Sequence, residues 1–196
     1  MTKDKILESA YRLFAINGYE GTSLSQIAKE VGIKKPSIYA HFSSKEEIFT
    51  TILDTTINKF YMYLDRIFSE TKGQDTEYTL SHIYYRIIDY FSMFKSAKEF
   101  YSIILFFPPT FLEDVINTKL EKIKDKVKIS LDKIFVEAMK NGEINEEEIN
   151  FLIYSYLSLV HGSFGMMLYD TEEENQLLMK SNVEKNWNIY WKGIKK

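Results

Sequence analysis

The stretch TSLSQIAKEVGIKKPSIYAHF, residues 22–42, predicts two short helices joined by a tight turn. Ser23 can cap the first helix, and Gln26 stands three residues later, which is the spacing of a capping box. Gly32 stands where this helix has to end, because glycine adopts positive φ without strain. Local signals therefore set both ends of the first helix.

The second helix, roughly residues 35–42, carries Pro36 in its first turn, where a helix accepts proline. Apolar residues of the stretch share one inward face: Leu24, Ile27, Ala28, Val31, Ile33 and Ile38. Polar residues are left on the outer side: Lys34, Lys35, Ser37, Tyr39 and His41. In a helix-turn-helix of this form the second helix enters the major groove of DNA, so these outer residues are candidates for DNA contacts.

Residues 5–50 resemble the N-terminal domain of TetR-family transcriptional regulators. The resemblance rests on the opening helix ILESAYRLFAINGYEGTSLSQIA, the turn VGI, the segment KKPSIYAHF and the tail SSKEEIF. It implies groove-facing residues on the second helix and a phosphate-contacting lysine at the start of the next long helix, while a helix N-terminus can also meet phosphate. The candidate DNA-binding residues are Ser23, Lys34, Lys35, Pro36, Ser37, Tyr39, His41 and Lys45.

Two positions depart from the family pattern. His41 stands where tyrosine is common, and Lys34 stands where a serine or threonine cap is usual. Lysine cannot accept a hydrogen bond from an unpaired N–H, so we expect this helix to start less firmly or to start at Lys35. Lys34 could instead contact a phosphate, and each such contact steepens the salt dependence of binding by about 0.9 in log–log slope.

Charge is distributed in the way a DNA-binding head requires, although the net charge of the 196-residue chain is −3. Residues 1–50 hold 7 Lys/Arg against 6 Asp/Glu, and the rest holds 18 against 22. Residues 29–45 carry a net charge of +3, so the positive charge is focused near the second helix. The absence of cysteine excludes disulfides, thiolate metal sites and cysteine nucleophiles, and with no signal peptide recognised we expect a cytoplasmic protein.

The whole chain reads as helix, which predicts an all-α fold of about nine helices. We predict a three-helix DNA-binding domain at residues 1–46 and a helical ligand-binding and dimerisation domain at residues 47–196. Capping boxes are expected at Ser44–Glu47, Ser96–Glu99 and Thr171–Glu174. The expected helices after residue 42 span about 44–72, 76–95, 96–107, 109–140, 146–169 and a last segment ending near 194.

The segment INFLIYSYLSLVHGSFGMMLY, residues 149–169, is apolar around nearly its whole circumference. Serines and His161 interrupt the apolar run, which argues against a membrane span. We expect burial between the chain's own core and a second subunit, and the alternative is a central core helix of a monomer. The resemblance implies a four-helix dimer interface formed by the two last helices. Expected interface residues are Leu152, Tyr156, Val160, Gly162, Gly165, Trp187 and Trp191.

Aromatic residues crowd the region between residues 60 and 111. A stripe of aromatics at helical spacing is more often plain core, but the resemblance raises the possibility of a pocket for a small effector. Such a cavity would suit an apolar or flat ligand, or a lipophilic cation. The candidate pocket residues are Phe60, Tyr63, Tyr84, Phe91, Phe94, Phe107 and Phe111.

The sequence therefore predicts a DNA-binding regulator, acting as a homodimeric, ligand-responsive repressor on a near-palindromic operator. No nucleophile–base pair, phosphate loop or metal cluster is recognised, so we expect neither catalysis nor a cofactor or metal. His82 and His161 are isolated, and the lysine-rich stretch 119–133 is read as a solvated helix face. Two alternatives stay open: a small-molecule-binding helical protein without a DNA role, and a TetR-like activator.

Overall fold

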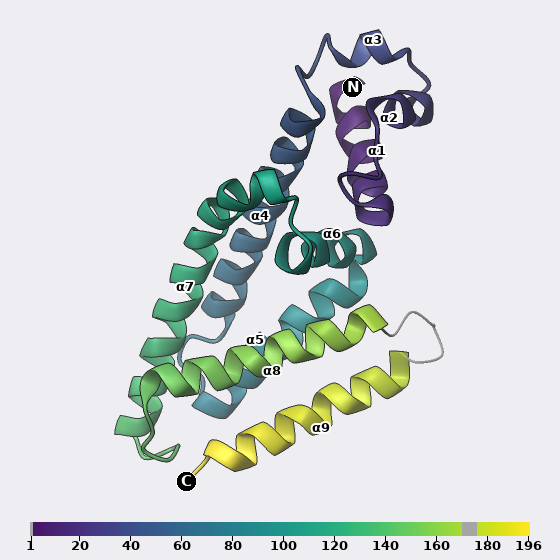
Figure 1. The fold of residues 1–196 in the computed structure, drawn as a ribbon. Coiled ribbons are helices and arrows are strands. Elements are labelled where there is room, and N and C mark those ends of the chain that lie inside the picture. Colours follow the sequence, from purple (N-terminus) through teal and green to yellow (C-terminus); the bar gives the residue numbers. More distant parts are fainter. Residues whose placement is uncertain (1, 170–175) are drawn as a thin grey trace. The chain divides into compact units, whose positions relative to one another are not determined.

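The computed structural model describes residues 2–169 and 176–196, and the described residues confirm the all-α fold. They contain one isolated β-bridge, between Ile144 and Lys195, and no longer strand. Figure 1 labels the nine α-helices found in these ranges. Their bounds, with the single 3₁₀ helix η1, are α1 Thr2–Asn17, α2 Leu24–Val31, α3 Lys35–Ile38, α4 Lys45–Glu70, α5 Thr76–Met93, α6 Lys95–Phe106, η1 Thr110–Leu112, α7 Glu113–Lys140, α8 Ile149–Tyr169 and α9 Gln176–Ile194.

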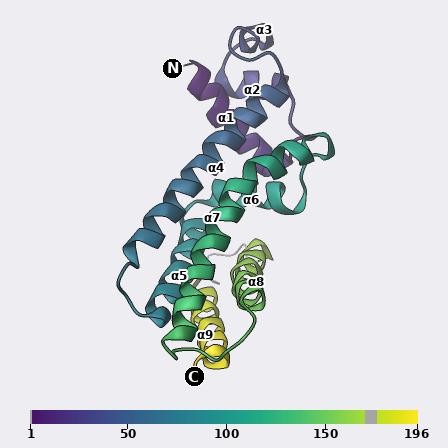
Figure 2. The ribbon, with the colours of Figure 1, turned by 90° about the vertical axis from the view of Figure 1, so that its left-hand side faces the viewer.

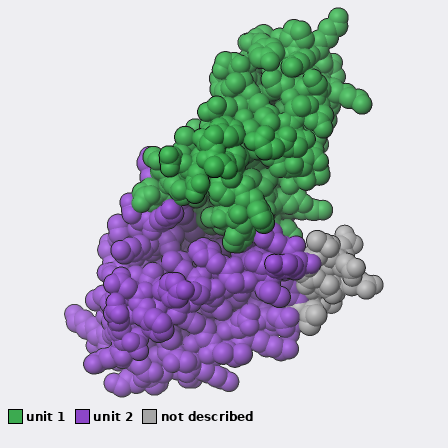
Figure 3. All heavy atoms as spheres, viewed as in Figure 1, with its two compact units in different colours: residues 1–61, 94–121 green, residues 62–93, 122–196 purple. Residues whose placement is uncertain are grey.

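The chain divides into two compact units, coloured separately in Figure 3. Unit 1 comprises Met1–Tyr61 and Phe94–Glu121, and unit 2 comprises Met62–Met93 and Lys122–Lys196. The long helices α4 and α7 each contribute residues to both units. Unit 1 therefore holds the helix-turn-helix together with α6 and the start of α7. The functional boundary predicted between residues 46 and 47 stays a prediction.

Three helix starts or ends differ from the sequence-based expectations. Helix α3 ends at Ile38 rather than at residue 42, and the chain continues in single hydrogen-bonded turns, in which the N–H groups of His41 and Phe42 both donate to the Ile38 carbonyl. Helix α8 begins at Ile149 rather than at residue 146. Helix α7 begins at Glu113 rather than at about residue 109, because Thr110–Leu112 form the 3₁₀ helix η1.

Two of the expected capping boxes are not formed as predicted. Helix α6 begins at Lys95 after Phe94, without a side-chain cap, so Ser96 lies inside the helix. At the start of α4 the Ser44 hydroxyl accepts from the Glu47 N–H at 3.1 Å, as expected, but the Glu47 carboxylate binds Ser43 instead of Ser44. The box expected at Thr171–Glu174 lies outside the described residues.

The core of unit 1 is a group of aromatic rings from five segments. Phe14 of α1 contacts Phe49 of α4 at 5.3 Å between ring centroids, and Phe49 contacts Phe100 of α6 at 5.4 Å. Tyr19, in the loop after α1, contacts Phe49 at 5.2 Å and Phe111 of η1 at 5.2 Å. These contacts join the helix-turn-helix to α6 and to η1 within one unit.

The core of unit 2 is built from α5, α8 and α9, which pack against one another (Figure 2). The Tyr84 hydroxyl of α5 shares a 2.7 Å hydrogen bond with Ser163 of α8, and the Tyr156 hydroxyl donates to the Leu80 carbonyl at 2.7 Å. Burial raises the pKa of Tyr156, and raises that of Tyr190 to about 12. Both phenols therefore stay protonated at neutral pH.

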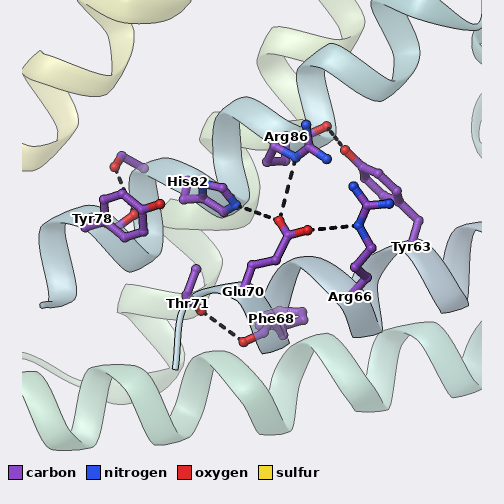
Figure 4. A network of polar contacts seen from close by, with 9 residues as sticks. Tyr63, Arg66, Phe68, Glu70, Thr71, Tyr78, His82 and Arg86 are labelled. Atoms are coloured by element: carbon purple, nitrogen blue, oxygen red, sulfur yellow. Dashed lines mark hydrogen bonds and ion pairs between the residues drawn. The ribbon is translucent and has the colours of Figure 1, made fainter. Parts of the chain in front are cut away.

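A polar network joins the last turns of α4 to α5 (Figure 4). The Glu70 carboxylate accepts from Arg66 Nε at 2.8 Å and contacts His82 Nε2 at 3.0 Å. The Tyr63 hydroxyl donates to the Arg86 carbonyl at 2.7 Å, while the Arg86 guanidinium lies over the Tyr63 ring. The network fixes α4 against α5 inside unit 2.

Candidate nucleic-acid interface

The first helix of the helix-turn-helix has the capping box that the sequence predicts. The Ser23 hydroxyl accepts from the Gln26 N–H at 3.2 Å, and the Gln26 side chain accepts from the Ser23 N–H at 2.7 Å. At the other end Gly32 has φ of 76°, and the N–H groups of Gly32 and Ile33 donate to the carbonyls of Lys29 and Ala28. This is a Schellman motif, so both ends of α2 are fixed and the turn is positioned.

Helix α3 presents its polar side chains to solvent. It starts at Lys35 and its N-cap residue Lys34 makes no side-chain capping bond, as its chemistry predicts. Ile38 is buried and anchors the helix, while Tyr39 is 52% exposed. The structure brings together on this exposed segment the predicted residues Lys34, Lys35, Pro36, Ser37, Tyr39 and His41.

Lys45, predicted to contact phosphate, is engaged inside unit 1. Its Nζ donates to the carbonyls of Tyr19 at 2.8 Å and Thr22 at 2.9 Å, and lies 4.0 Å from the centroid of the Tyr19 ring. An ammonium group has three donors, so one remains for a phosphate. The observed contacts make Lys45 a residue that positions the loop directly before Ser23.

The start of α4 is tied to the end of the α3 segment. Glu47 accepts from the Ser43 N–H at 2.6 Å and from the Ser43 hydroxyl at 2.7 Å. These hydrogen bonds, with a smaller contribution from Lys3, lower the pKa of Glu47. Glu47 therefore stays ionised beside the exposed α3 segment, and its negative charge repels a phosphate that approaches there.

Lys3 is not among the DNA-binding residues that were predicted from the sequence. Its Nζ lies 5.2 Å from the centroid of the Phe42 ring, directly after the exposed α3 segment. One signal was available in the sequence, because a lysine in the first turn of a helix opposes the helix dipole. Its position beside residue 42 depends on tertiary folding, and no local pattern gives it.

The seven candidate pocket residues are divided between the two units. Phe60, Phe94, Phe107 and Phe111 belong to unit 1, and Tyr63, Tyr84 and Phe91 belong to unit 2. Phe107 and Phe111 are exposed, whereas Tyr84 and Phe91 are buried in the core of unit 2, where Phe91 contacts Phe164 at 4.6 Å. These seven residues therefore do not form one cluster within either unit.

The predicted interface residues also fall into two groups. Gly162 is exposed on α8 and Gly165 is half-buried. The other five are already buried within unit 2 and are core residues of the single chain, so they do not lie on its surface: Leu152, Tyr156, Val160, Trp187 and Trp191. Helix α8 faces solvent instead with its opposite side, which includes Phe151, Tyr154, Ser158, His161, Met166 and Tyr169.

Helix α8 is also long and apolar enough to cross a membrane by length and composition. The central helix of a water-soluble protein passes the same test, and one face of α8 is packed in the core of unit 2. The helix is therefore weak evidence for a membrane protein.

Comparison with known proteins agrees with this geometry. Residues 6–52 match the family model described as bacterial regulatory proteins, tetR family. The chain is 39% identical over 82 residues to the biofilm operon icaADBC HTH-type negative transcriptional regulator IcaR of Staphylococcus epidermidis, which covers 42% of this chain and 41% of that protein. It is 26% identical over 193 residues to IcaR of Staphylococcus aureus strain Newman, covering 97% of this chain and 99% of that protein.

A solved structure shares the whole fold. The crystal structure of AibR in complex with isovaleryl coenzyme A and operator DNA matches with a TM-score of 0.69 and 22% identity, over 93% of this chain and 96% of that one. At this identity the match concerns the fold alone. The family match over the helix-turn-helix and the full-length relatives agree, and together they support a TetR-family transcriptional regulator.

Proposed function

We propose that this regulator is a ligand-responsive repressor that binds a near-palindromic operator as a homodimer in the cytoplasm. The observation that carries the DNA-binding part is the α3 segment, which is fixed from below by buried Ile38 and exposes lysine, serine, tyrosine and histidine side chains. The full-length relatives described as negative regulators support repression. Two heads would engage half-sites about 34–36 Å apart, or a multiple of that spacing.

The test of DNA binding uses fluorescence anisotropy with the intergenic duplex upstream of the chain's own gene. Lys35→Ala and Tyr39→Ala should weaken binding, since a good base contact contributes about 1–3 kcal/mol of discrimination. Lys59→Ala, which removes the same charge from the exposed side of α4, is the matched control and should leave affinity nearly unchanged. Equal binding by the parent and the two α3 variants, all folded, would contradict the assignment.

For the homodimer we propose the exposed side of α8 as the surface that meets the second copy. Large apolar side chains on a solvent-facing helix, such as Tyr154 and Met166, are typical of an interface. Gly162 lies among them, and a Cβ built there meets no atom within 4 Å. The glycine is therefore not required by the chain's own packing, which agrees with a close approach by another helix.

Gly162→Leu provides a sharp test, because the single chain has room for the new side chain. We expect the folded protein to sediment as monomers and its thermal stability as a single chain to be kept or raised, since glycine weakens a helix by roughly 0.5–1 kcal/mol relative to alanine. Asn117→Leu adds the same side chain to the exposed face of α7 and should stay dimeric. A dimer that persists in Gly162→Leu would place the interface elsewhere.

For the effector we propose a small molecule whose apolar part is bound by the aromatic-rich helical body. The match in fold to AibR, solved with isovaleryl coenzyme A, makes a short-chain acyl-CoA the first compound to test. Coupling of about 1–3 kcal/mol per site would weaken DNA binding about 5–150-fold. Adding isovaleryl-CoA to the protein–DNA complex, with free coenzyme A as control, measures this release, and equal behaviour with both compounds would exclude an acyl-selective site.

A further inference from the structure

Lys3 lies where a second contact to DNA can form. In both ribbon views the first turn of α1 lies at the same end of unit 1 as α3 (Figures 1 and 2). The Lys3 side chain is exposed, and its Nζ lies 5.2 Å from the Phe42 ring centroid. Phe42 itself is buried, and its N–H donates to the Ile38 carbonyl at 3.0 Å. The ammonium group is therefore held beside a fixed point of the α3 segment.

The stability of α1 does not explain a lysine at this position. The N-terminal end of a helix carries partial positive charge, so a cation in the first turn is repelled by the helix dipole. The ring contact of Lys3 is made with Phe42, which lies outside α1, and its charge also interacts with the carboxylates of Glu47 and of Asp4 in its own helix. A cation placed against its own helix dipole and kept exposed suits the recognition of an external anion.

Lys3 also adds a positive charge near Lys45, whose ammonium group is largely engaged by the protein itself. Two of the three Lys45 donors are used by the Tyr19 and Thr22 carbonyls, whereas the carboxylate of Glu47 adds negative charge next to Ser43. A further cation near the segment after α3 therefore favours the approach of a DNA phosphate. Lys3 is placed to supply it.

We propose that Lys3 contacts a phosphate of the DNA backbone flanking the groove that α3 enters. The contact rests on the proposed DNA-binding function and extends the interface from the helix-turn-helix to the first turn of α1. A lysine–phosphate contact positions the protein without reading sequence. Lys3 should therefore contribute equally to operator DNA and to random-sequence DNA.

The test compares Lys3→Met, Lys3→Arg and Lys5→Met by anisotropy between about 50 and 200 mM salt. Lys5→Met is the matched control, because it removes the same charge from the same exposed turn, about 200° around the helix axis. Each protein is titrated with the upstream intergenic duplex and with a random-sequence duplex. Circular dichroism shows whether each variant keeps the helix content of the parent.

Lys3→Met should reduce the log–log salt slope by about 1.8 for a dimer with two heads, with roughly ten- to hundredfold weaker binding at ~0.1 M salt on both duplexes. Lys3→Arg should keep the parent slope, and so should Lys5→Met. An unchanged slope in folded Lys3→Met, or an equal decrease in Lys5→Met, would overturn the contact while DNA binding by the parent still stands. A parent protein that binds neither duplex would instead refute the proposed function.

Discussion

The head of unit 1 and the core of unit 2 are stabilised in different ways. In the head, hydrogen bonds between near neighbours in the sequence set the ends of short helices, as Ser23 and Gln26 do for α2. In unit 2, buried side chains from segments far apart in sequence determine the packing, as Tyr84 and Ser163 do between α5 and α8. In the helix-turn-helix, contacts within a few residues therefore position the exposed side chains. In unit 2, the fold depends on buried contacts between helices that are far apart in the sequence.

The largest expected effect tests whether Trp187 is core or interface. Trp187 is 3% exposed and its ring lies 5.9 Å from those of Tyr190 and Trp191. Trp187→Ala should therefore cost about 3–5 kcal/mol of unfolding free energy, because it leaves a cavity in unit 2. Urea unfolding of dilute protein measures this cost.

Ile189 provides the control on the same helix, because it is 72% exposed. Ile189→Ala should change the unfolding free energy of the single chain by no more than about 0.5 kcal/mol. If Trp187→Ala left the unfolding free energy intact and only dissociated the dimer, the side chain would belong to an interface and the contrast between the two units would fail.

The same contrast explains what the sequence could predict. The capping box at Ser23, the turn at Gly32 and the exposed lysines of α3 depend on residues within a few positions, so local chemistry was sufficient. Lys45 shows the limit of this approach. Its partners, the carbonyls of Tyr19 and Thr22, lie 26 and 23 residues away, and a family pattern assigns a lysine to phosphate without showing such contacts.

Helix α8 shows a second limit. Its sequence is apolar on all sides, so periodicity could not decide which side faces the chain's own core. The structure buries the side with Tyr156 and Val160 and exposes the side with Tyr154 and Met166. Only the packing of α5 and α9 against α8 distinguishes the two sides, and that packing involves residues some 80 positions apart.

The second prediction concerns the buried hydroxyl pair of Tyr84 and Ser163, which are 2.7 Å apart. Ser163→Ala should cost about 1–3 kcal/mol, because it leaves the Tyr84 hydroxyl buried without its partner. The double variant Tyr84→Phe/Ser163→Ala should be more stable than Ser163→Ala alone, since both polar groups are then removed. A complete double-mutant cycle by urea unfolding measures the coupling, and strictly additive losses would argue against the pair.

A smaller effect is expected at the cap of α2. Ser23→Ala should cost about 1 kcal/mol, because the Gln26 N–H loses its acceptor, whereas Ser23→Gly should cost only about a few tenths. The midpoint temperature of thermal unfolding and the affinity for DNA should decrease together, since α2 supports the turn before α3. Ser25→Ala, one residue into the exposed side of α2, is the control and should be neutral or slightly stabilising. Equal losses at Ser23 and Ser25 would show that the cap is not the cause.

The smallest effect is the pH dependence contributed by Glu70 at the end of α4. Hydrogen bonds from His82 and then from Arg66 lower the pKa of this carboxyl group (Figure 4). A carboxyl group whose folded pKa is depressed stabilises the protein above its unfolded pKa of about 4.3 and loses that contribution as the pH falls through the folded pKa. Acid should therefore weaken this network from below about pH 5.

Glu70→Gln isolates this contribution, because glutamine has no proton to gain. We expect the variant to be slightly less stable than the parent at neutral pH, and the difference in urea midpoint to shrink as the pH falls toward ~4. The carboxylate of Glu70 joins α4 to α5. If the difference in urea midpoint between the parent and Glu70→Gln grew in acid, the ionised carboxylate would not be the stabilising form. The polar contacts of Glu70 would then contribute to unit 2 only through their packing.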